Sequence, residues 1–223
     1  MTEYRHEWKH EIDLSGHLAV RQRLRAVAQV DRHAEGGAYL VRSLYFDTPG
    51  DKALREKLDG VNCREKFRIR HYNEDLTGLR LEKKSRRNGL GRKDMADMTP
   101  EEVRALLRGE REWMAGSGRP LLQELYSKMK SQGLRPRSVV EYRREPFVYG
   151  PGNVRVTLDY DIRTGLEAGG FLDGGVTFPA AVGLTVLEVK WDEFLPDVIR
   201  DAVQLPGCRT GSFSKYALCR RFG

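Results

Sequence analysis

The chain has 223 residues, of which 39% are hydrophobic and 32% charged, and 39 Lys and Arg against 32 Asp and Glu leave a formal net charge of +7. A chain of this length can bury a sizeable core, and its basic excess indicates an anionic partner such as nucleic acid, a phosphate compound or an anionic surface. No apolar run approaches the ~20 residues of a membrane-spanning helix, and the charged N-terminus lacks a secretory signal, so we expect a soluble, cytoplasmic protein.

The first half of the chain is predicted to contain four strands and two helices, from alternating and helical apolar patterns. The strands cover residues 4–12, 39–47, 63–72 and 79–85, and the helices residues 14–29 and 51–58. The basic, glycine-containing segment 86–94 is predicted to be a loop.

The second half begins with a clear helix start, in which Thr99 caps, Pro100 takes the first position and Glu102 the third. A second helix is predicted from Pro120 to Gln132, ending before Gly133. The remaining segments are strands at 138–149, 153–161 and 184–191, a Gly-rich loop at 165–183 with a short strand near Val176, a helix from Pro196 to before Pro206, and a final helix at 213–222.

These elements predict the fold class. The sequence shows no linker and no break in composition, so residues 1–223 are expected to form a single domain. Strands outnumber the helices that parallel crossovers need, and many strands are half polar. We therefore expect an α+β protein in which antiparallel strands close into a barrel, with the helices packed outside. The three cysteines, Cys63, Cys208 and Cys219, form no C-x-x-C pair, so a thiolate zinc site or a disulfide framework is not expected.

The segment His6-Glu7-Trp8-Lys9-His10 matches H-E-x-x-H, which on a helix is the zinc-protease signature. Too few residues precede His6 to form the sheet that normally supports a zinc-binding helix of this kind. No third metal ligand follows His10 either. On a strand, the same letters place Glu7 and Lys9 on one face and the two histidines with Trp8 on the other. The strand interpretation is favoured, with the histidines packed under a helix.

Charged residues recur at two-residue spacing in several predicted strands, and each set shares one face because side chains at i and i+2 of a strand point the same way. The sets are Glu7 and Lys9, Arg68 and Arg70, Glu82 and Lys84, Tyr142 and Arg144, Arg155 with Thr157, Asp159 and Asp161, and Glu188 and Lys190. Apolar residues alternate with them. The charged faces could point into solvent from an open sheet, but six stripes favour a charged lumen in a closed sheet.

A lumen of this kind needs a compensating polyanion or carboxylates, because enclosed cations repel one another. Guanidinium groups match phosphate oxygens, and carboxylates beside them would hold a divalent cation that bridges to the phosphate. The chain has no G-x-x-x-x-G-K-[ST] loop and no G-x-G-x-x-G after a strand, so phosphate binding must come from side chains. Nucleic acid is not expected, because Phe67, Phe147 and Trp191 alternate with the charges and are predicted to be buried.

The order of short motifs along the chain resembles the VTC domain family. The motifs are R-x-E-x-K at Arg5 to Lys9, S-L-Y-F-D-T at Ser43 to Thr48, R-x-R at Arg68 to Arg70, L-E-K-K at Leu81 to Lys84, Y-R-R at Tyr142 to Arg144, V-R-V-T-L-D at Val154 to Asp159, L-E-V-K at Leu187 to Lys190 and S-K-Y at Ser214 to Tyr216. This family contains the catalytic domain of the vacuolar transporter chaperone polyphosphate polymerase. It belongs to the triphosphate tunnel metalloenzymes, which are related to CYTH phosphatases and adenylyl cyclases.

The resemblance implies an eight-stranded antiparallel β-tunnel that binds a triphosphate with Mn²⁺ or Mg²⁺. The implied metal ligand is Glu188, with Glu7 as a second. Ser214 and Tyr142 are implied to assist as cofactor-binding residues, and Lys190 is added because it shares the charged face of its strand. The implied phosphate ligands are Lys9, Arg68, Arg70, Lys84, Arg144, Arg155 and Lys215.

The implied activity is phosphoryl transfer from ATP or another nucleoside triphosphate to a growing polyphosphate or pyrophosphate acceptor. If water attacks instead, the chain is a tripolyphosphatase or nucleoside triphosphatase, and a non-catalytic polyphosphate-binding module is a third alternative. Eukaryotic members of the family carry an SPX sensor and membrane spans. This sequence contains neither, so it resembles a stand-alone, bacterial-type VTC domain, and no protein partner is identifiable from it.

Overall fold

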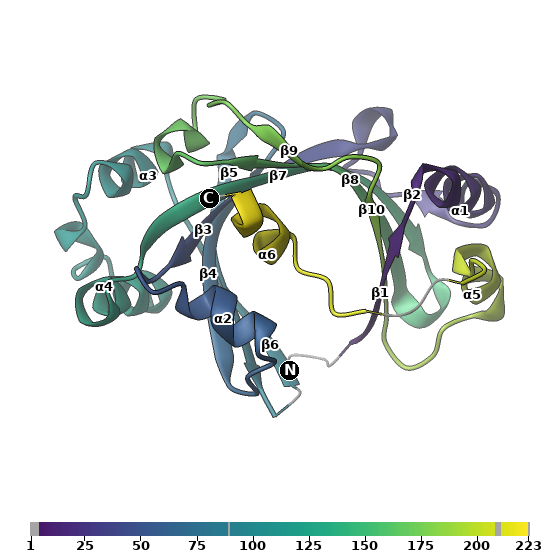
Figure 1. Ribbon diagram of the computed structural model, residues 1–223, viewed down its shortest axis with the longest axis horizontal. Helices are drawn as coiled ribbons and strands as arrows, with labels where there is room; N and C mark the ends of the chain where they lie inside the picture. Colours follow the sequence, from purple (N-terminus) through teal and green to yellow (C-terminus); the bar gives the residue numbers. More distant parts are fainter. Residues whose placement is uncertain (1–4, 89, 208–210, 223) are drawn as a thin grey trace. The chain divides into compact units, whose positions relative to one another are not determined.

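The computed structural model describes residues 5–88, 90–207 and 211–222 (Figure 1). The β-strands are β1 His6–Ile12, β2 Gln29–Val30, β3 Tyr39–Asp47, β4 Arg64–Tyr72, β5 Asp75–Arg87, β6 Leu90–Asp97, β7 Arg135–Tyr149, β8 Val154–Gly165, β9 Phe178–Ala181 and β10 Thr185–Trp191. The α-helices are α1 Leu14–Val27, α2 Lys52–Leu58, α3 Pro100–Leu107, α4 Pro120–Gln132, α5 Asp197–Val203 and α6 Lys215–Cys219.

Local sequence signals account for the ends of several helices. Helix α3 starts at a capping box, in which the Thr99 hydroxyl accepts from the Glu102 backbone N–H and the Glu102 carboxylate accepts from the Thr99 N–H. Helix α4 begins at Pro120 and ends at Gly133, whose φ of +68° is the left-handed conformation that glycine adopts without strain. Both helices lie where the sequence predicts them.

The predicted loop at 86–94 is wrong, because Arg86, Arg87 and residues 90–94 lie in the two strands of a long hairpin. β5 continues to Arg87, Asn88 adopts a φ of +50° and β6 begins at Leu90. Asparagine tolerates this turn conformation, and an Asn-Gly pair is a strong hairpin signal. The strand is hard to recognise because Arg92 and Lys93 are exposed and no residue of β6 is fully buried.

The strands form one antiparallel pairing path, in the order β1-β10-β8-β7-β3-β4-β5-β6, with β2 paired to β7 and β9 to β8. The expected α+β class with an eight-stranded antiparallel path is confirmed, with six α-helices in the part of the chain that the structure describes. The H-E-x-x-H segment lies on β1, so the zinc-protease interpretation is excluded.

The chain divides into two compact units, each built from three chain segments. Unit 1 comprises Met1–Leu40, Tyr142–Ile162 and Ala181–Ser214. Its core lies between one face of β1, β10 and β8 and the helices α1 and α5, which lie side by side in Figure 1. Val156, Leu187 and Val189 are fully buried there, and they alternate with the charged residues of the same strands.

Unit 2 comprises Val41–Glu141, Arg163–Ala180 and Lys215–Gly223. In its core, Leu44 of β3, Phe67 of β4 and Leu81 of β5 pack against helix α4 through Leu122 and Leu125. Helix α3 contributes to the same core (Figure 1). The opposite face of the same strands carries Tyr45, Arg68 and Glu82, and there Tyr216 of α6 stacks on Tyr45. Because successive side chains of a strand point to opposite sides, the strands of each unit have one apolar face, covered by helices, and one charged face. No α-helix in the described ranges is long and apolar enough to cross a membrane.

Candidate functional site

The charged face of unit 1 is built from three neighbouring strands in register. Glu7 of β1 lies opposite Lys190 of β10, which lies opposite Arg155 of β8. One row further along, the order is Lys9, Glu188 and Thr157. Directly opposed residues in an antiparallel pair project to the same side of the sheet. Register thus brings together five of the sequence-predicted site residues, namely Glu7, Lys9, Arg155, Glu188 and Lys190.

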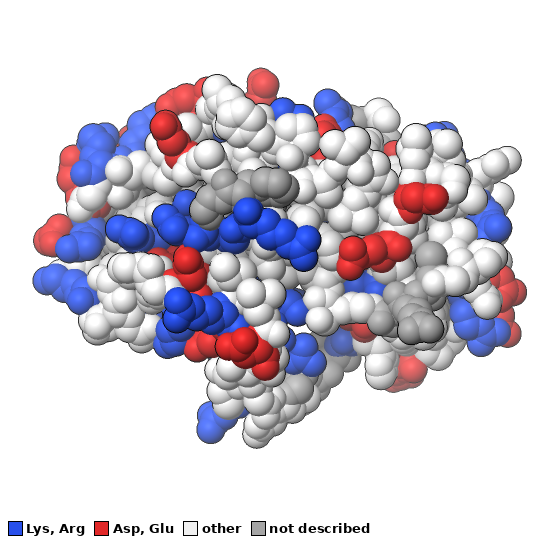
Figure 2. Space-filling view, in the orientation of Figure 1, with Lys and Arg blue, Asp and Glu red and all other residues white. Residues whose placement is uncertain are grey.

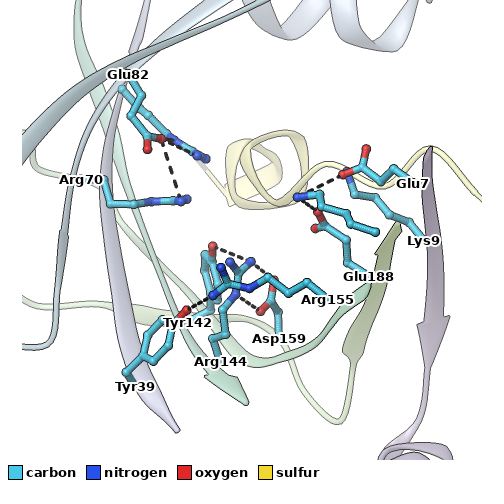
Figure 3. Close-up of polar contacts among 12 residues, drawn as sticks. Glu7, Lys9, Tyr39, Arg70, Glu82, Tyr142, Arg144, Arg155, Asp159 and Glu188 are labelled. Atoms are coloured by element: carbon cyan, nitrogen blue, oxygen red, sulfur yellow. Dashed lines mark hydrogen bonds and ion pairs between the residues drawn. The ribbon is translucent and has the colours of Figure 1, made fainter. Parts of the chain in front are cut away.

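Two carboxylates and two ammonium groups form a quartet on this face (Figure 3). Lys9 Nζ lies 3.0 Å from Glu7 Oε1, Lys190 Nζ lies 3.5 Å from the same oxygen, and Lys190 also pairs with Glu188. Glu188 is buried, and Lys190 bridges its carboxylate to that of Glu7. Burial opposes its ionisation, but Lys190 and Lys9 hold the pKa of Glu188 well below its usual range. The quartet thus keeps a buried carboxylate ionised.

Arg144 of β7 is held by a fully buried carboxylate on the same face. Its Nε and one terminal nitrogen lie 2.6 and 2.7 Å from the two carboxylate oxygens of Asp159. Its second contact is the Tyr142 hydroxyl at 3.4 Å (Figure 3). Burial opposes the charge, but Asp159 keeps the pKa of Arg144 well above its usual value. This bidentate geometry fixes the guanidinium plane.

Arg155 is anchored by two residues from the N-terminal segment of unit 1. One terminal nitrogen lies 3.1 Å from the Tyr39 hydroxyl and 3.0 Å from Asp31 Oδ2. Its buried Nε has no hydrogen-bond partner among the described residues. Thr157, two residues along β8 and 4% exposed, likewise has a buried hydroxyl oxygen without a described partner.

The Glu7 and Glu188 pair can be tested as a metal site by its donor chemistry. Mg²⁺ and related hard cations take oxygen ligands, commonly one or two carboxylates completed by substrate phosphates and water. The two carboxylates come from adjacent strands and both pair with Lys190 Nζ, so they lie close enough together to fit this mode. Within the described ranges no group of three or more His, Cys, Asp and Glu side chains could hold a metal ion. A metal here would therefore need phosphate or water ligands.

Unit 2 carries a separate cationic cluster around one buried carboxylate. Glu82 Oε2 lies 2.6 Å from both Nε and a terminal nitrogen of Arg68, and 3.9 Å from Arg70 (Figure 3). Lys93 of β6 pairs with the other oxygen of Glu82. Burial alone would raise the pKa of Glu82, but Arg68, Arg70 and Lys93 lower it to about 2. Glu82 thus holds three cations on one face.

Tyr45 of β3 lies within this cluster. Its hydroxyl accepts a hydrogen bond from Arg68 at 2.9 Å, and Lys66 Nζ lies 5.6 Å from its ring centroid. Burial opposes ionisation, but Arg68, Lys66 and Arg70 lower the pKa of Tyr45 to about 7. Arg70 is itself held by Ser43, whose hydroxyl oxygen lies 3.0 Å from Arg70 Nε.

Helix α6 is attached to this face through Tyr216. The Tyr216 ring stacks on Tyr45 at 4.9 Å, and its hydroxyl donates to Asp47 Oδ2 at 2.7 Å. Lys215 precedes it as the first residue of α6. Asp47 also accepts from the backbone N–H groups of Ala53 and Leu54 at the start of α2. Figure 2 shows Lys and Arg side chains gathered over α2 and α6, with Asp and Glu among them.

The remaining sequence-predicted residues are placed as follows. Lys84 is exposed on β5, opposite Lys66 on one side and Lys93 on the other, so three lysines form a row across unit 2. Ser214 is half-buried at the end of the unit 1 segment that precedes α6. The predicted residues therefore fall into two groups. Unit 1 holds Glu7, Lys9, Tyr142, Arg144, Arg155, Glu188, Lys190 and Ser214, and unit 2 holds Arg68, Arg70, Lys84 and Lys215.

Sequence reasoning missed or misplaced several members of the two clusters. Two-residue spacing placed Asp159 and Thr157 on the face of Arg155, but it assigned neither of them a role in the site. Lys93 was missed because its strand was predicted as a loop. Asp161, predicted on the same face, adopts a φ of +49° within β8, and its side chain is exposed. His6 and His10 lie on the face of Trp8, as expected, and His6 stacks on Trp191 at 5.3 Å.

Comparison with solved structures identifies the fold. A putative adenylyl cyclase from Hippeastrum, HpAC1, described as having a dominant triphosphatase activity, matches with a TM-score of 0.57 at 15% identity, over 98% of this chain and 96% of that one. A putative adenylate cyclase from Bacillus halodurans matches with a TM-score of 0.51 at 15% identity, over 90% and 86%. The PH1012 protein from Pyrococcus horikoshii matches with a TM-score of 0.51 at 13% identity, over 96% and 98%. The chain thus shares its fold with these three proteins.

The family follows from sequence. The profile of the VTC domain matches residues 4–222, which is nearly the whole chain. The protein therefore belongs to the VTC domain family, and the resemblance inferred from its motifs is confirmed. A comparison with curated protein sequences found no match.

Proposed function

We propose that this VTC domain transfers the γ-phosphoryl group of ATP, or of another nucleoside triphosphate, to the end of a growing polyphosphate chain. The observation that carries the proposal is the charged face of unit 1, where Lys9, Lys190 and Arg155 lie around two carboxylates that share Lys190 as an ion-pair partner. Membership of the VTC family and the fold support it. The same proposal includes Mn²⁺ or Mg²⁺ at Glu7 and Glu188.

The side chains of unit 1 suit a triphosphate because they supply fixed donors. Arg144 is held in one plane by Asp159, and Arg155 is held by Tyr39 and Asp31, so binding an anion needs little reordering of either guanidinium. A divalent cation at the carboxylate pair would neutralise charge on the transferring group. Lys9 and Lys190, now paired with these carboxylates, would then be released toward phosphate oxygens.

The reaction breaks the bond between the γ-phosphorus and its bridging oxygen and forms a bond to a terminal oxygen of the acceptor, with ADP as the leaving group. No protein nucleophile is required, because positioning and charge stabilisation dominate phosphoryl transfer. The cationic cluster of unit 2, with Arg68, Arg70, Lys84 and Lys215, is proposed as a further phosphate-binding surface.

A triphosphatase is the second candidate, since the Hippeastrum protein of similar fold is described as having that activity. Its chemistry differs only in the acceptor, which is water. A polyphosphate-binding module without turnover is the third.

The products distinguish these three functions. The purified chain is incubated with ATP and Mn²⁺, and ADP, orthophosphate and chain-length-resolved polyphosphate are quantified together. A polymerase releases ADP without an equal amount of orthophosphate and accumulates long chains. Equal amounts of ADP and orthophosphate without chains, or orthophosphate released from tripolyphosphate, would instead show a triphosphatase. Binding of tripolyphosphate with no product from either compound would show a binding module.

A further inference from the structure

Thr157 occupies an unusual position in unit 1. It lies in the middle of β8, directly opposite Glu188, on the face that carries Lys9 and Lys190. Its neighbours Val156 and Leu158 point into the apolar core and are buried. The side chain is only 4% exposed, and its hydroxyl has no hydrogen-bond partner among the described residues.

A buried hydroxyl without a partner is unfavourable, by about 1–3 kcal/mol. Threonine is also stiff at χ1, so its hydroxyl has few alternative positions from which to find one. A valine of nearly the same shape would remove this penalty without leaving a void. The hydroxyl therefore has no evident stabilising role in the free protein.

A second unpartnered donor lies two residues away on the same face. The Nε of Arg155 is buried and has no described partner, whereas its terminal nitrogen is held by Tyr39 and Asp31. Residues i and i+2 of a strand project to the same side. An arginine N–H and a threonine hydroxyl both donate hydrogen bonds, so the pair suits an anion with several acceptor oxygens.

Lys190 lies opposite Arg155 and thus diagonal to Thr157, and Lys9 lies beyond Glu188 in the row of Thr157, so both supply positive charge to this face. Phosphate oxygens combine negative charge with several acceptor sites. Building on the proposed function, we propose that Thr157 is a binding residue whose hydroxyl donates a hydrogen bond to a phosphate oxygen of the triphosphate or polyphosphate substrate, beside Arg155. Its register position opposite Glu188 would place this contact next to the carboxylate pair.

Two substitutions at Thr157 and a matched control test this assignment. Thr157→Val removes the hydroxyl and keeps the shape, and Thr157→Ser keeps the hydroxyl. Thr185→Val is the control, because Thr185 is also buried in unit 1 but its hydroxyl bonds His17 Nδ1 at 2.9 Å. The melting temperature of each free protein is measured, and then the affinity for inorganic tripolyphosphate by calorimetry without metal.

Thr157→Val is expected to melt at or above the wild-type temperature when free and to bind tripolyphosphate roughly tenfold more weakly, as expected from one lost hydrogen bond to a charged group. Thr157→Ser should bind within about threefold of wild type, which corresponds to less than one neutral hydrogen bond. Thr185→Val should melt lower and bind tripolyphosphate as wild type does.

The assignment is overturned if Thr157→Val binds tripolyphosphate as tightly as wild type. It is also overturned if the free variant melts lower, as Thr185→Val does, because the hydroxyl then has a partner within the folded chain. If the wild-type protein itself fails to bind tripolyphosphate, the proposed function is contradicted together with this assignment. If it binds but forms no polyphosphate from ATP, the polymerase proposal alone is contradicted.

Discussion

Replacing Glu82 tests how the cationic cluster of unit 2 is held together. Glu82 is buried and contacts Arg68, Arg70 and Lys93. Its pKa falls from 4.5 to about 2 in the folded protein. A difference of about 2.5 pKa units, at about 1.4 kcal/mol each, corresponds to about 3.5 kcal/mol of stability from the ionised form. We therefore expect Glu82→Gln to lower the free energy of unfolding at pH 7 by about 2–3 kcal/mol.

The stability that ionised Glu82 contributes depends on pH. Because the folded pKa lies below the unfolded one, this stability is fully present above pH 4.5 and is lost as the pH falls toward about 2. Wild type should therefore lose stability across that range, and Glu82→Gln should lose about 3.5 kcal/mol less. Urea unfolding at a series of pH values measures both effects.

A matched control is Glu74→Gln, since Glu74 is exposed and lies outside the cluster. It should unfold as wild type does. Tripolyphosphate should also stabilise Glu82→Gln more than wild type, because an added anion replaces the missing carboxylate. The reasoning is refuted if Glu82→Gln at pH 7 unfolds within about 0.5 kcal/mol of wild type, the range of an ordinary surface substitution.

Two further predictions concern single side chains. Tyr45 should ionise near pH 7, so tyrosinate absorbance should appear at that pH in wild type and be missing from Tyr45→Phe; an unchanged titration in the variant would contradict the assignment. Asp159→Asn leaves the Arg144 guanidinium without its counter-charge, so the free energy of unfolding should fall by about 3–5 kcal/mol. Asp173→Asn, at an exposed position, is its control, and equal unfolding of the two variants would show that the pair contributes nothing.

Much of the fold was predictable because alternation and capping signals are local. β3 was predicted at its observed bounds, and α4 between its Pro120 and Gly133 signals. β6 was not, since its exposed, charged residues lack the apolar alternation that marks a half-buried strand. The positive φ of Asp161 within β8 was also missed, because it depends on local packing that the alternating pattern does not show.

The candidate site was also predictable in part, because alternation along a strand is a local signal. Two-residue spacing correctly assigned Lys9, Glu188 and Lys190 to one face, and the structure adds their partners. The pairing of Arg144 with Asp159, and of Arg155 with Tyr39, joins residues distant in sequence, which spacing alone does not show. The expectation that the charged faces line one closed lumen stays a prediction, as do the single domain, the bound metal and the cytoplasmic location.

The central claim is that the charged strand faces of this VTC domain carry out metal-dependent phosphoryl transfer. Release of ADP from ATP in the presence of Mn²⁺ is compared between wild type, Glu188→Gln and Glu193→Gln, an exposed control position. Glu188→Gln should lose roughly 100-fold or more in kcat, as expected if several kcal/mol of charge stabilisation is lost, while Glu193→Gln matches wild type. Unchanged Mn²⁺-dependent turnover in a folded Glu188→Gln protein, or no turnover in wild type, would contradict the account.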